Sequence, residues 1–197
     1  MDGPQYLQPA MAKMPESHLW NGTEDLAVSL ALAWNEQGLY LAARVRDDVH
    51  LQRQSGSLIW MDDALQFAID AANDALLPAT CGQAGYDGND LNAGMALTAA
   101  GPAFQVWVEK GSTKTAGGRD YPLAIRRQGT ETTYEAILPW PALAPLEPRT
   151  GRAFGFSLLA FDNDRSEDRQ AACRMELTPG IADGQDPSAY RTFVLGE

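Results

Sequence analysis

The chain has 197 residues, 45% of them hydrophobic, which is enough for one sizeable core and fits one domain better than two. Fifteen lysines and arginines against 26 aspartates and glutamates give a formal net charge of −11, which repels phosphate backbones and anionic lipid. No apolar run has the length of a membrane helix, and the first residues lack the basic start and apolar middle of a signal peptide. These features argue against a nucleic-acid partner, a membrane span and an intact secretory signal.

The first strands can be located from the alternation of bulky side chains. Three prolines fall among the first 15 residues without any periodicity, so residues 1–15 are predicted to be an extended arm or linker before a domain over residues 16–197. From residue 26 to 34 a bulky side chain stands at every second position, which is the period of a strand with one buried face. A turn sequence at 35–38 and a second alternation over 39–46 complete the pattern of a β-hairpin.

The same alternation continues to the end of the chain. It predicts further strands over residues 65–70, 104–109, 122–127, 133–138, 153–161 and 190–195. The connecting segments are rich in glycine, asparagine and aspartate, and the helical candidates are short turns near residues 142–146. Eight or nine short strands with almost no helix predict an all-β fold, a jelly-roll β-sandwich of mostly antiparallel strands.

The sequence carries none of the common motifs of catalysis. The sequence contains no GxSxG, no phosphate-binding glycine loop and no HExxH. The two cysteines, Cys81 and Cys173, could pair or could both be buried thiols. The two histidines, His18 and His50, are too far apart in sequence to be read as a ligand pair. The chain is therefore predicted not to be an enzyme.

Acidic residues gather in three segments that the alternation leaves as loops. They follow the second strand at 47–48, occupy the connection from 70 to 90, and recur over 162–168. Clustered carboxylate and amide oxygens suit Ca²⁺, which takes six to eight oxygen ligands. The predicted cofactor is structural calcium, with Asp47, Asp70, Asp162 and Asp164 as the metal ligands. The alternative is that aspartate and asparagine simply favour solvated turns.

Five tryptophans are divided between the core and a possible sugar platform. Trp34 and Trp140 share the parity of aliphatic neighbours and are predicted to lie in the core. Trp20 is placed at the bottom of the fold. Trp107 has the opposite parity to its apolar neighbours, so it should lie on the polar face of its sheet. Trp60 precedes a strand as a candidate exposed platform, with a packed aromatic as the alternative.

Four ordered segments carry a resemblance to a known family. LAVSLALAWNEQGLYLAARVRDD, IWMDDALQFAID, YEAILPW and FGFSLLAFDNDR resemble the successive signatures of the family 9 carbohydrate-binding modules, which are related to DOMON β-sandwiches. The resemblance covers about residues 16 to 195. It implies a distorted jelly roll with calcium in its loops and a sugar between aromatic side chains. Such modules are usually appended to secreted or surface enzymes that degrade polysaccharides, which implies an extracellular or periplasmic setting, a carbohydrate partner and other modules.

The resemblance also suggests which residues bind the sugar. Trp60 matches the first tryptophan of the family's aromatic sandwich, and Gln66 falls where a sugar-contacting glutamate often stands. Gly184 occupies the place of the second tryptophan, with Tyr190 nearby. Asn92 is the nearest equivalent of the contacts on the middle strand. Together with Trp107, the predicted carbohydrate site is Trp60, Gln66, Asn92, Trp107 and Tyr190.

Two other functions remain open at this point. DOMON-type domains of similar fold bind haem b between a methionine and a histidine or lysine, and six methionines and two histidines make that formally possible. A calcium-stabilised spacer domain would keep the metal and lack the sugar. Because a single aromatic platform buries little area, sugar binding is predicted to be weak.

Overall fold

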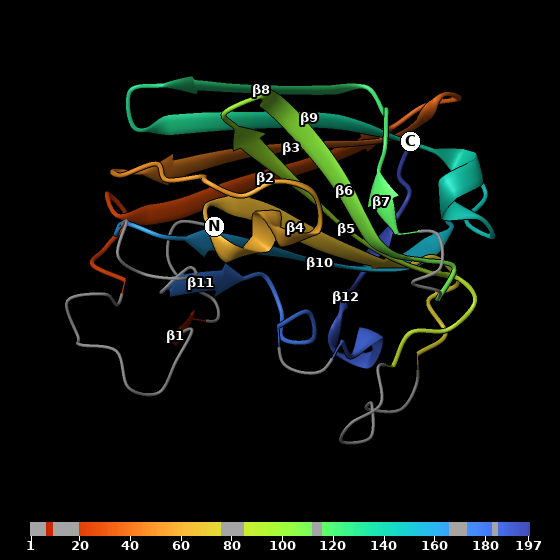
Figure 1. Cartoon of the computed structure of the whole chain (residues 1–197). Helices are drawn as coiled ribbons and strands as arrows, with labels where there is room; N and C mark the ends of the chain where they lie inside the picture. Colours follow the sequence, from red (N-terminus) through yellow and green to blue (C-terminus); the bar gives the residue numbers. More distant parts are fainter. Residues whose placement is uncertain (1–6, 10–19, 76–84, 112–115, 166–172, 183–184) are drawn as a thin grey trace.

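Two antiparallel sheets make up the protein. The computed structural model describes residues 7–9, 20–75, 85–111, 116–165, 173–182 and 185–197. The sheets lie face to face, as Figure 1 shows, with the smaller one above the larger one. This arrangement confirms the predicted all-β sandwich. Within the described residues no helix is long and apolar enough to cross a membrane.

The smaller sheet has four strands in the order β2-β3-β9-β8. They are β2 (Leu26–Trp34), β3 (Gly38–Asp47), β8 (Leu123–Gln128) and β9 (Glu131–Pro139). Strands β2 and β3 form the predicted hairpin, in register from Leu26 opposite Asp47 to Trp34 opposite Leu39. Alternate residues of each strand face the core. They are Leu26, Val28, Leu39, Leu41, Ala43, Val45, Ile125, Tyr134, Ala136 and Leu138.

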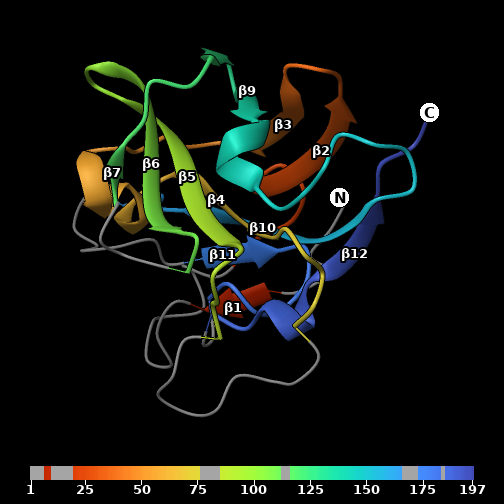
Figure 2. The same cartoon turned by 90° about the vertical axis from the view of Figure 1, so that its right-hand side faces the viewer.

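The larger sheet contains eight strands in the order β1-β11-β10-β4-β5-β6-β7, with β12 also paired to β10. Their bounds are β1 (Leu7–Pro9), β4 (Ala64–Asp70), β5 (Asp90–Thr98), β6 (Gly101–Glu109), β7 (Gly117–Gly118), β10 (Ala153–Asp162), β11 (Cys173–Glu176) and β12 (Arg191–Val194). Three short 3-10 helices are described: η2 (Gly56–Met61), η3 (Trp140–Leu143) and η4 (Pro187–Ala189). Figure 2 shows β4, β5 and β6 side by side in the larger sheet.

The core between the sheets is built from large apolar side chains. Phe67 lies at its centre, 5.9 Å from Phe104 and 6.4 Å from Phe156 between ring centroids. Trp140 packs edge-to-face on Trp34 at the far end of the hairpin. Trp140 is buried in the core as predicted, whereas Trp34 is half-buried and packs against the edge of the core. Burial of these rings and of the aliphatic side chains around them is the main force that holds the two sheets together.

The opposite, outer face of the larger sheet is covered as well. Its side chains form a second buried cluster with η2 and with Ile181, Ala182 and Tyr190 of the C-terminal segments. The cluster contains Ile59, Ala64, Ala68, Ala96, Leu159, Phe161, Ile181 and Tyr190. Strands β4, β5 and β10 are consequently buried on both faces. The helix η2 and the C-terminal segments therefore stand above the outer face of the larger sheet, and the candidate site lies between them.

The structure corrects two details of the sequence interpretation. Residues 90–98 form strand β5, although 71–92 had the composition of a long loop. The acidic residues are also not simply loop residues, because Asp47, Asp70 and Asp162 each end a strand and are buried. Cys173 is a buried free thiol, whereas Cys81 and His18 lie outside the described residues.

Candidate functional site

A hollow of about 260 Å³ opens on the outer face of the larger sheet. Its floor comes from β4, β5, β6 and β10, and its walls come from η2 and from the segments before η4. The lining residues are Trp60, Gln66, Asn92, Trp107, Leu159, Phe161, Arg174, Ile181, Ala182 and Gln185. The hollow is at the lower end of the usual size of ligand pockets. It combines aromatic and aliphatic surface with amide groups, a mixture that suits a small polar ligand with an apolar face.

Trp60 is placed by the short helix η2. The side chain is half-buried and belongs to the edge of the second cluster. Its ring lies 6.3 Å from the ring of Phe161, centroid to centroid, at an interplanar angle of 54°. Ile59, the preceding residue, is fully buried and anchors the helix to the sheet. Because one side of Trp60 packs on Phe161, the orientation of the indole is fixed by the fold and the other part of its surface lines the hollow.

Trp107 reaches the hollow because of an irregularity in the sheet. Asn92 pairs with Val108 and Ala93 pairs with Val106, so Trp107 sits at a β-bulge and projects from the outer face. Its indole Nε1 donates a hydrogen bond of 2.9 Å to the carbonyl of Ser57 on η2. The bond ties both tryptophans to the same helix.

Gly94 of β5 leaves the space that the Trp107 ring needs. A Cβ atom at residue 94 would lie 2.5 Å from Cη2 of Trp107, closer than Cβ atoms approach other atoms. The absence of a side chain at this position therefore lets the end of the indole approach the backbone of β5 closely. The sequence gives no sign of this contact, because an isolated glycine in a strand has several possible reasons.

Polar groups of the floor form a chain of hydrogen bonds. Gln66 Nε2 donates to Asn92 Oδ1 at 2.8 Å, and Asn92 Nδ2 donates to the Tyr86 hydroxyl at 2.8 Å. The hydroxyls of Tyr86 and Tyr190 lie 3.0 Å apart. Burial raises the pKa of both phenols above their ordinary value, so both stay neutral. The chain holds the Gln66 and Asn92 amides in one orientation towards the hollow, ready to exchange hydrogen bonds with hydroxyl groups.

A second group of functional side chains lies where β3 and β10 end. Asp47, Asp162 and Asp164 each place a carboxylate oxygen within 4.8 Å of the other two, and Asp25, Asp48 and Asp164 form a similar group. Asp162 is 3% exposed, and its Oδ1 has no hydrogen-bond partner among the described residues. An unpartnered buried carboxylate oxygen is costly unless a cation neutralises it.

The electrostatics of this acidic cluster point the same way. Burial, reinforced by the neighbouring carboxylates, raises the pKa of Asp47 to about 7, that of Asp164 to about 6 and that of Asp162 to about 10. Arg127 already pairs with Asp47, with its Nη1 3.1 Å from Asp47 Oδ2, and a further positive charge beside Asp162 and Asp164 would favour their ionised forms. Oxygen donors of this kind fit a hard cation such as Ca²⁺, for which they would supply charge and ligands.

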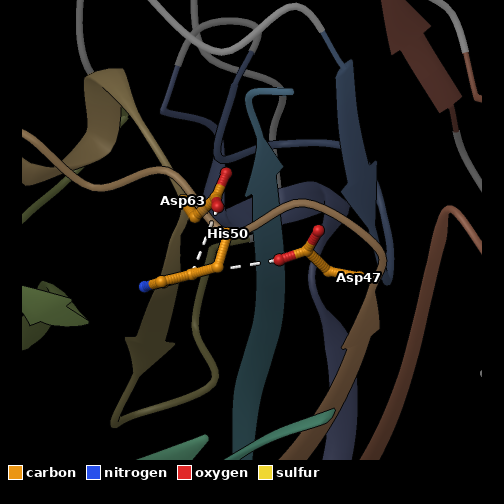
Figure 3. A group of neighbouring side chains, drawn as sticks. All are labelled: Asp47, His50 and Asp63. Carbon is orange, nitrogen blue, oxygen red and sulfur yellow. Dashed lines mark ion pairs between the residues drawn. The ribbon is translucent and has the colours of Figure 1, made fainter. Parts of the chain in front are cut away.

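His50 stands beside this cluster with both ring nitrogens engaged. Its Nδ1 lies 3.2 Å from Asp63 Oδ2 and 3.9 Å from Asp47 Oδ2 (Figure 3), while Nε2 lies 3.3 Å from the carbonyl of Leu97. The hydrogen bond to Asp63 is the main cause that raises the pKa of His50. The position of His50 therefore favours the imidazolium form. Because both ring nitrogens have partners, neither is left to bind a haem iron.

Comparison with known proteins also indicates a carbohydrate-binding domain. The sequence model of the family described as "Carbohydrate family 9 binding domain-like" matches residues 5–197. The chain belongs to this family. It is a carbohydrate-binding module, and neither a haem domain nor a spacer domain is favoured. No curated protein sequence is similar enough to this module to count as a match.

Two solved structures share the fold of the module. One is a family 9 carbohydrate-binding module from Caldicellulosiruptor kristjanssonii in complex with cellotriose, with 15% identity, a TM-score of 0.65 and coverage of 98% of this chain and 80% of that chain. The other is a family 9 module from the same organism in complex with glucose, with 14% identity, a TM-score of 0.63 and coverage of 99% and 93%. The similarity supports the family's β-sandwich fold for this module.

The structure brings together most of the residues that the sequence predicted for the sugar site of this module. Trp60, Gln66, Asn92 and Trp107 line one hollow, whereas Tyr190 belongs to the same outer cluster without lining the hollow and reaches Asn92 through the hydroxyl of Tyr86. Gly184 lies outside the described residues. The sequence interpretation missed Phe161, Arg174 and Gln185. Only Phe161 had a signal, because β10 carries bulky residues at both parities, as a strand covered on both faces does.

Of the four predicted metal ligands, Asp47, Asp162 and Asp164 come together in this module. Asp70 lies at the other end of β4, opposite Asp90 in the register of the sheet. Its carboxylate accepts hydrogen bonds from the backbone of Asn73, Asp74 and Ala75, so it closes a turn. The four residues therefore do not form a single site, and a metal at Asp70 stays a prediction.

Proposed function

We propose that this module binds short gluco-oligosaccharides, or the sugar end of a longer chain, in the hollow between Trp60 and Trp107. The observation that carries the proposal is the meeting of two half-buried indoles with two oriented amides in one small depression. Pyranose rings have apolar faces that stack on indoles and hydroxyl groups that need amide partners. The similar modules in complex with cellotriose and glucose support the choice of ligand.

The affinity is expected to be modest. One pyranose face that covers on the order of 60 to 100 Å² of an indole contributes about 1.5 to 2.5 kcal/mol. Hydrogen bonds to sugar hydroxyls add little, because water satisfies the same groups in the free state. Association itself costs several kcal/mol. A Kd in the high micromolar to millimolar range follows.

A titration by NMR or calorimetry tests the proposal. Glucose, cellobiose and cellotriose should each bind, and the perturbed resonances should map to Gln66, Asn92 and the two indoles. Galactose and mannose serve as probes of specificity with the same size and apolar faces. Absence of binding for every sugar at tens of millimolar, or perturbations confined to the smaller sheet, would contradict this assignment.

We also infer that the module has no catalytic activity of its own. The hollow presents amides, tryptophans and a guanidinium, and among the residues that the structure describes no pair of carboxylates lines it, whereas glycoside hydrolysis needs two such groups. Incubation with soluble glucans should release no reducing ends. Release that disappears on mutation of a specific acidic residue would overturn the inference.

Structural calcium at Asp47, Asp162 and Asp164 is the second part of the proposal. It is supported by Oδ1 of buried Asp162, which lies among neighbouring carboxylates and has no hydrogen-bond partner in the part of the chain that the structure describes. An ion bound only by the folded state raises its stability. Asp162→Asn should remove most of the increase in Tm that calcium produces, whereas Asp120→Asn, at an exposed position outside the cluster, should leave it intact. An equal Tm of the wild-type protein in calcium and in chelator would refute the site.

Membership of the family supports an extracellular or periplasmic setting. We propose that the module works as part of a larger polysaccharide-degrading protein. Localisation of the native protein by cell fractionation, with an antibody against the module, tests this. A signal confined to the cytoplasm would contradict it.

A further inference from the structure

The sugar hollow and the acidic cluster are linked by one buried side chain. We propose that Asn163 is a positioning residue that makes the placement of Trp60 depend on the cation at Asp47, Asp162 and Asp164. The inference rests on the proposed sugar and cation sites. It adds to them that the two sites are coupled, so that the cation tightens sugar binding without touching the sugar.

On the side of the acidic cluster, Asn163 lies between two of the proposed ligands. Asp162 and Asp164 are its neighbours in sequence, and Asn163 itself is fully buried at 0% exposure. Its Oδ1 accepts a hydrogen bond of 3.2 Å from the backbone N–H of Arg165. The side chain therefore closes the short turn that carries Asp164, and any movement of this turn moves Asn163.

On the side of the hollow, Asn163 holds the end of η2. Its Nδ2 donates to Asp62 Oδ1 at 2.6 Å, and its backbone N–H donates to Asp63 Oδ1 at 2.7 Å. Asp62 and Asp63 directly follow the helix that carries Trp60. Asp62 is 0% exposed, and Arg53 donates to the same carboxylate, so the anchor is rigid.

A second connection runs through the same strand. Phe161, whose ring packs on Trp60, immediately precedes Asp162. Residues 161 to 164 thus alternate between the two sites. Phe161 touches the sugar platform, Asp162 joins the acidic cluster, Asn163 holds η2 and Asp164 returns to the cluster.

A bound cation explains how the state of one site can reach the other. Held by Asp47, Asp162 and Asp164, it would join the end of β3 to the turn at 162–164. Without the cation this link is missing, and the turn is held less tightly. A helix of six residues has little rigidity of its own, so η2 follows its anchors. Trp60 and, through Ser57, Trp107 then lose their fixed positions.

The experiment uses the whole chain labelled with 5-fluorotryptophan, which gives one fluorine resonance for each of five tryptophans. Trp60→Phe assigns the resonance of Trp60. Calcium added to chelator-treated protein should shift the Trp60 resonance, and cellotriose should bind at least about fivefold more weakly in chelator than in calcium. By linkage, cellotriose should raise calcium affinity by the same factor.

Asn163→Ala is the decisive variant, and Trp140→Phe is its matched control. The control also loses one buried hydrogen bond, from Nε1 to the carbonyl of Asn35, at the end of the sandwich away from the acidic cluster. In Asn163→Ala, calorimetry should still detect calcium, whereas the shift of Trp60 and the calcium dependence of sugar affinity should both be smaller than in the wild type, because only the backbone bond to Asp63 and the Phe161 contact remain. Trp140→Phe should keep both.

The outcomes separate this inference from the function on which it rests. If no sugar binds in either condition, the proposed function fails. The coupling is then judged from the Trp60 resonance alone: a shift on addition of calcium supports it, and an unchanged resonance refutes it. If sugar binds equally well in calcium and in chelator while calcium binding is measurable, the coupling is refuted and the sugar site stands. An unchanged calcium response in Asn163→Ala would also refute it, because Asn163 would not carry the effect.

Discussion

The outer faces of the two sheets differ in what covers them. Across β2, β3 and β9, buried positions alternate with exposed or half-buried ones, and the outer face carries short side chains such as Ala31 and Ala33. In β4, β5 and β10 burial is nearly continuous, because η2 and the C-terminal segments cover the outer face. A bare sheet face offers a flat surface, whereas a covered face can enclose a hollow with walls. The smaller sheet also carries a hollow, of about 570 Å³, beside Tyr40 and Ile137, but the hollow on the covered face is the one that brings tryptophans and amide groups together.

The largest expected difference between these faces is in their tolerance of charge. Ala68 lies on the covered face at 0% exposure, and Ala31 lies on the bare face. Ala68→Lys should lower the free energy of unfolding by about 3 kcal/mol or more, because the ammonium group is buried without a partner. Ala31→Lys should change it by less than about 0.5 kcal/mol. Urea denaturation measures both, and equal effects would show that the outer face of the larger sheet is not covered.

The next largest effect concerns calcium, and its size should depend on pH. Without the ion, burial raises the pKa of Asp47 to about 7 and that of Asp162 to about 10, above the ordinary value near 4. The folded state then binds protons that the unfolded state does not. This stability is fully present below about pH 4 and is lost as pH rises through the raised pKa values.

Calcium replaces these protons, so its stabilising effect should grow with pH. At a hundredfold excess over Kd near pH 8 it should reach about 2.7 kcal/mol, and at pH 5, where protons compete, it should be smaller. Thermal unfolding in calcium and in chelator at the two pH values measures this. A calcium effect that is equal at pH 5 and pH 8 would mean that the ion binds elsewhere.

Removal of the sugar platform should have a somewhat smaller effect. Trp60→Ala deletes the indole that faces the hollow and should raise the Kd for cellotriose about tenfold or more, which corresponds to the apolar contact of one pyranose face. Tyr40→Ala removes a half-buried ring from the bare face of the smaller sheet and should leave the Kd unchanged. If the tyrosine variant weakens binding and the tryptophan variant does not, the sugar occupies the opposite face.

The comparison also explains what could be predicted from the sequence. Alternation identified the hairpin of β2 and β3 and the core strands, because each of these strands has a distinct buried face. It missed β5, whose small and polar residues at 92, 94 and 96 face a covered surface and do not produce alternation. The resemblance found Trp60, and parity placed Trp107 on the outer face. Their meeting depends on a bulge, on Ser57 and on Gly94, which are contacts between distant segments that no local pattern encodes.

The smallest expected effect concerns the contact between Gly94 and the indole of Trp107. In Gly94→Ala the new Cβ would lie 2.5 Å from Trp107 Cη2 and 2.8 Å from the carbonyl oxygen of Leu65. The indole must therefore tilt out of its place on the sheet, and cellotriose should bind about fivefold more weakly, an effect of about 1 kcal/mol.

Gly88→Ala is the matched control, because a Cβ at residue 88 would meet nothing within 4 Å. It should bind cellotriose like the wild type. A double variant separates the displacement of Trp107 from a general disturbance of the strand. In a Trp107→Ala background the added methyl has no ring to displace, so Gly94→Ala should cost no further affinity. A full loss in that background would place the cause in the strain at Leu65, and unchanged affinity in Gly94→Ala alone would show that Trp107 does not contact the sugar.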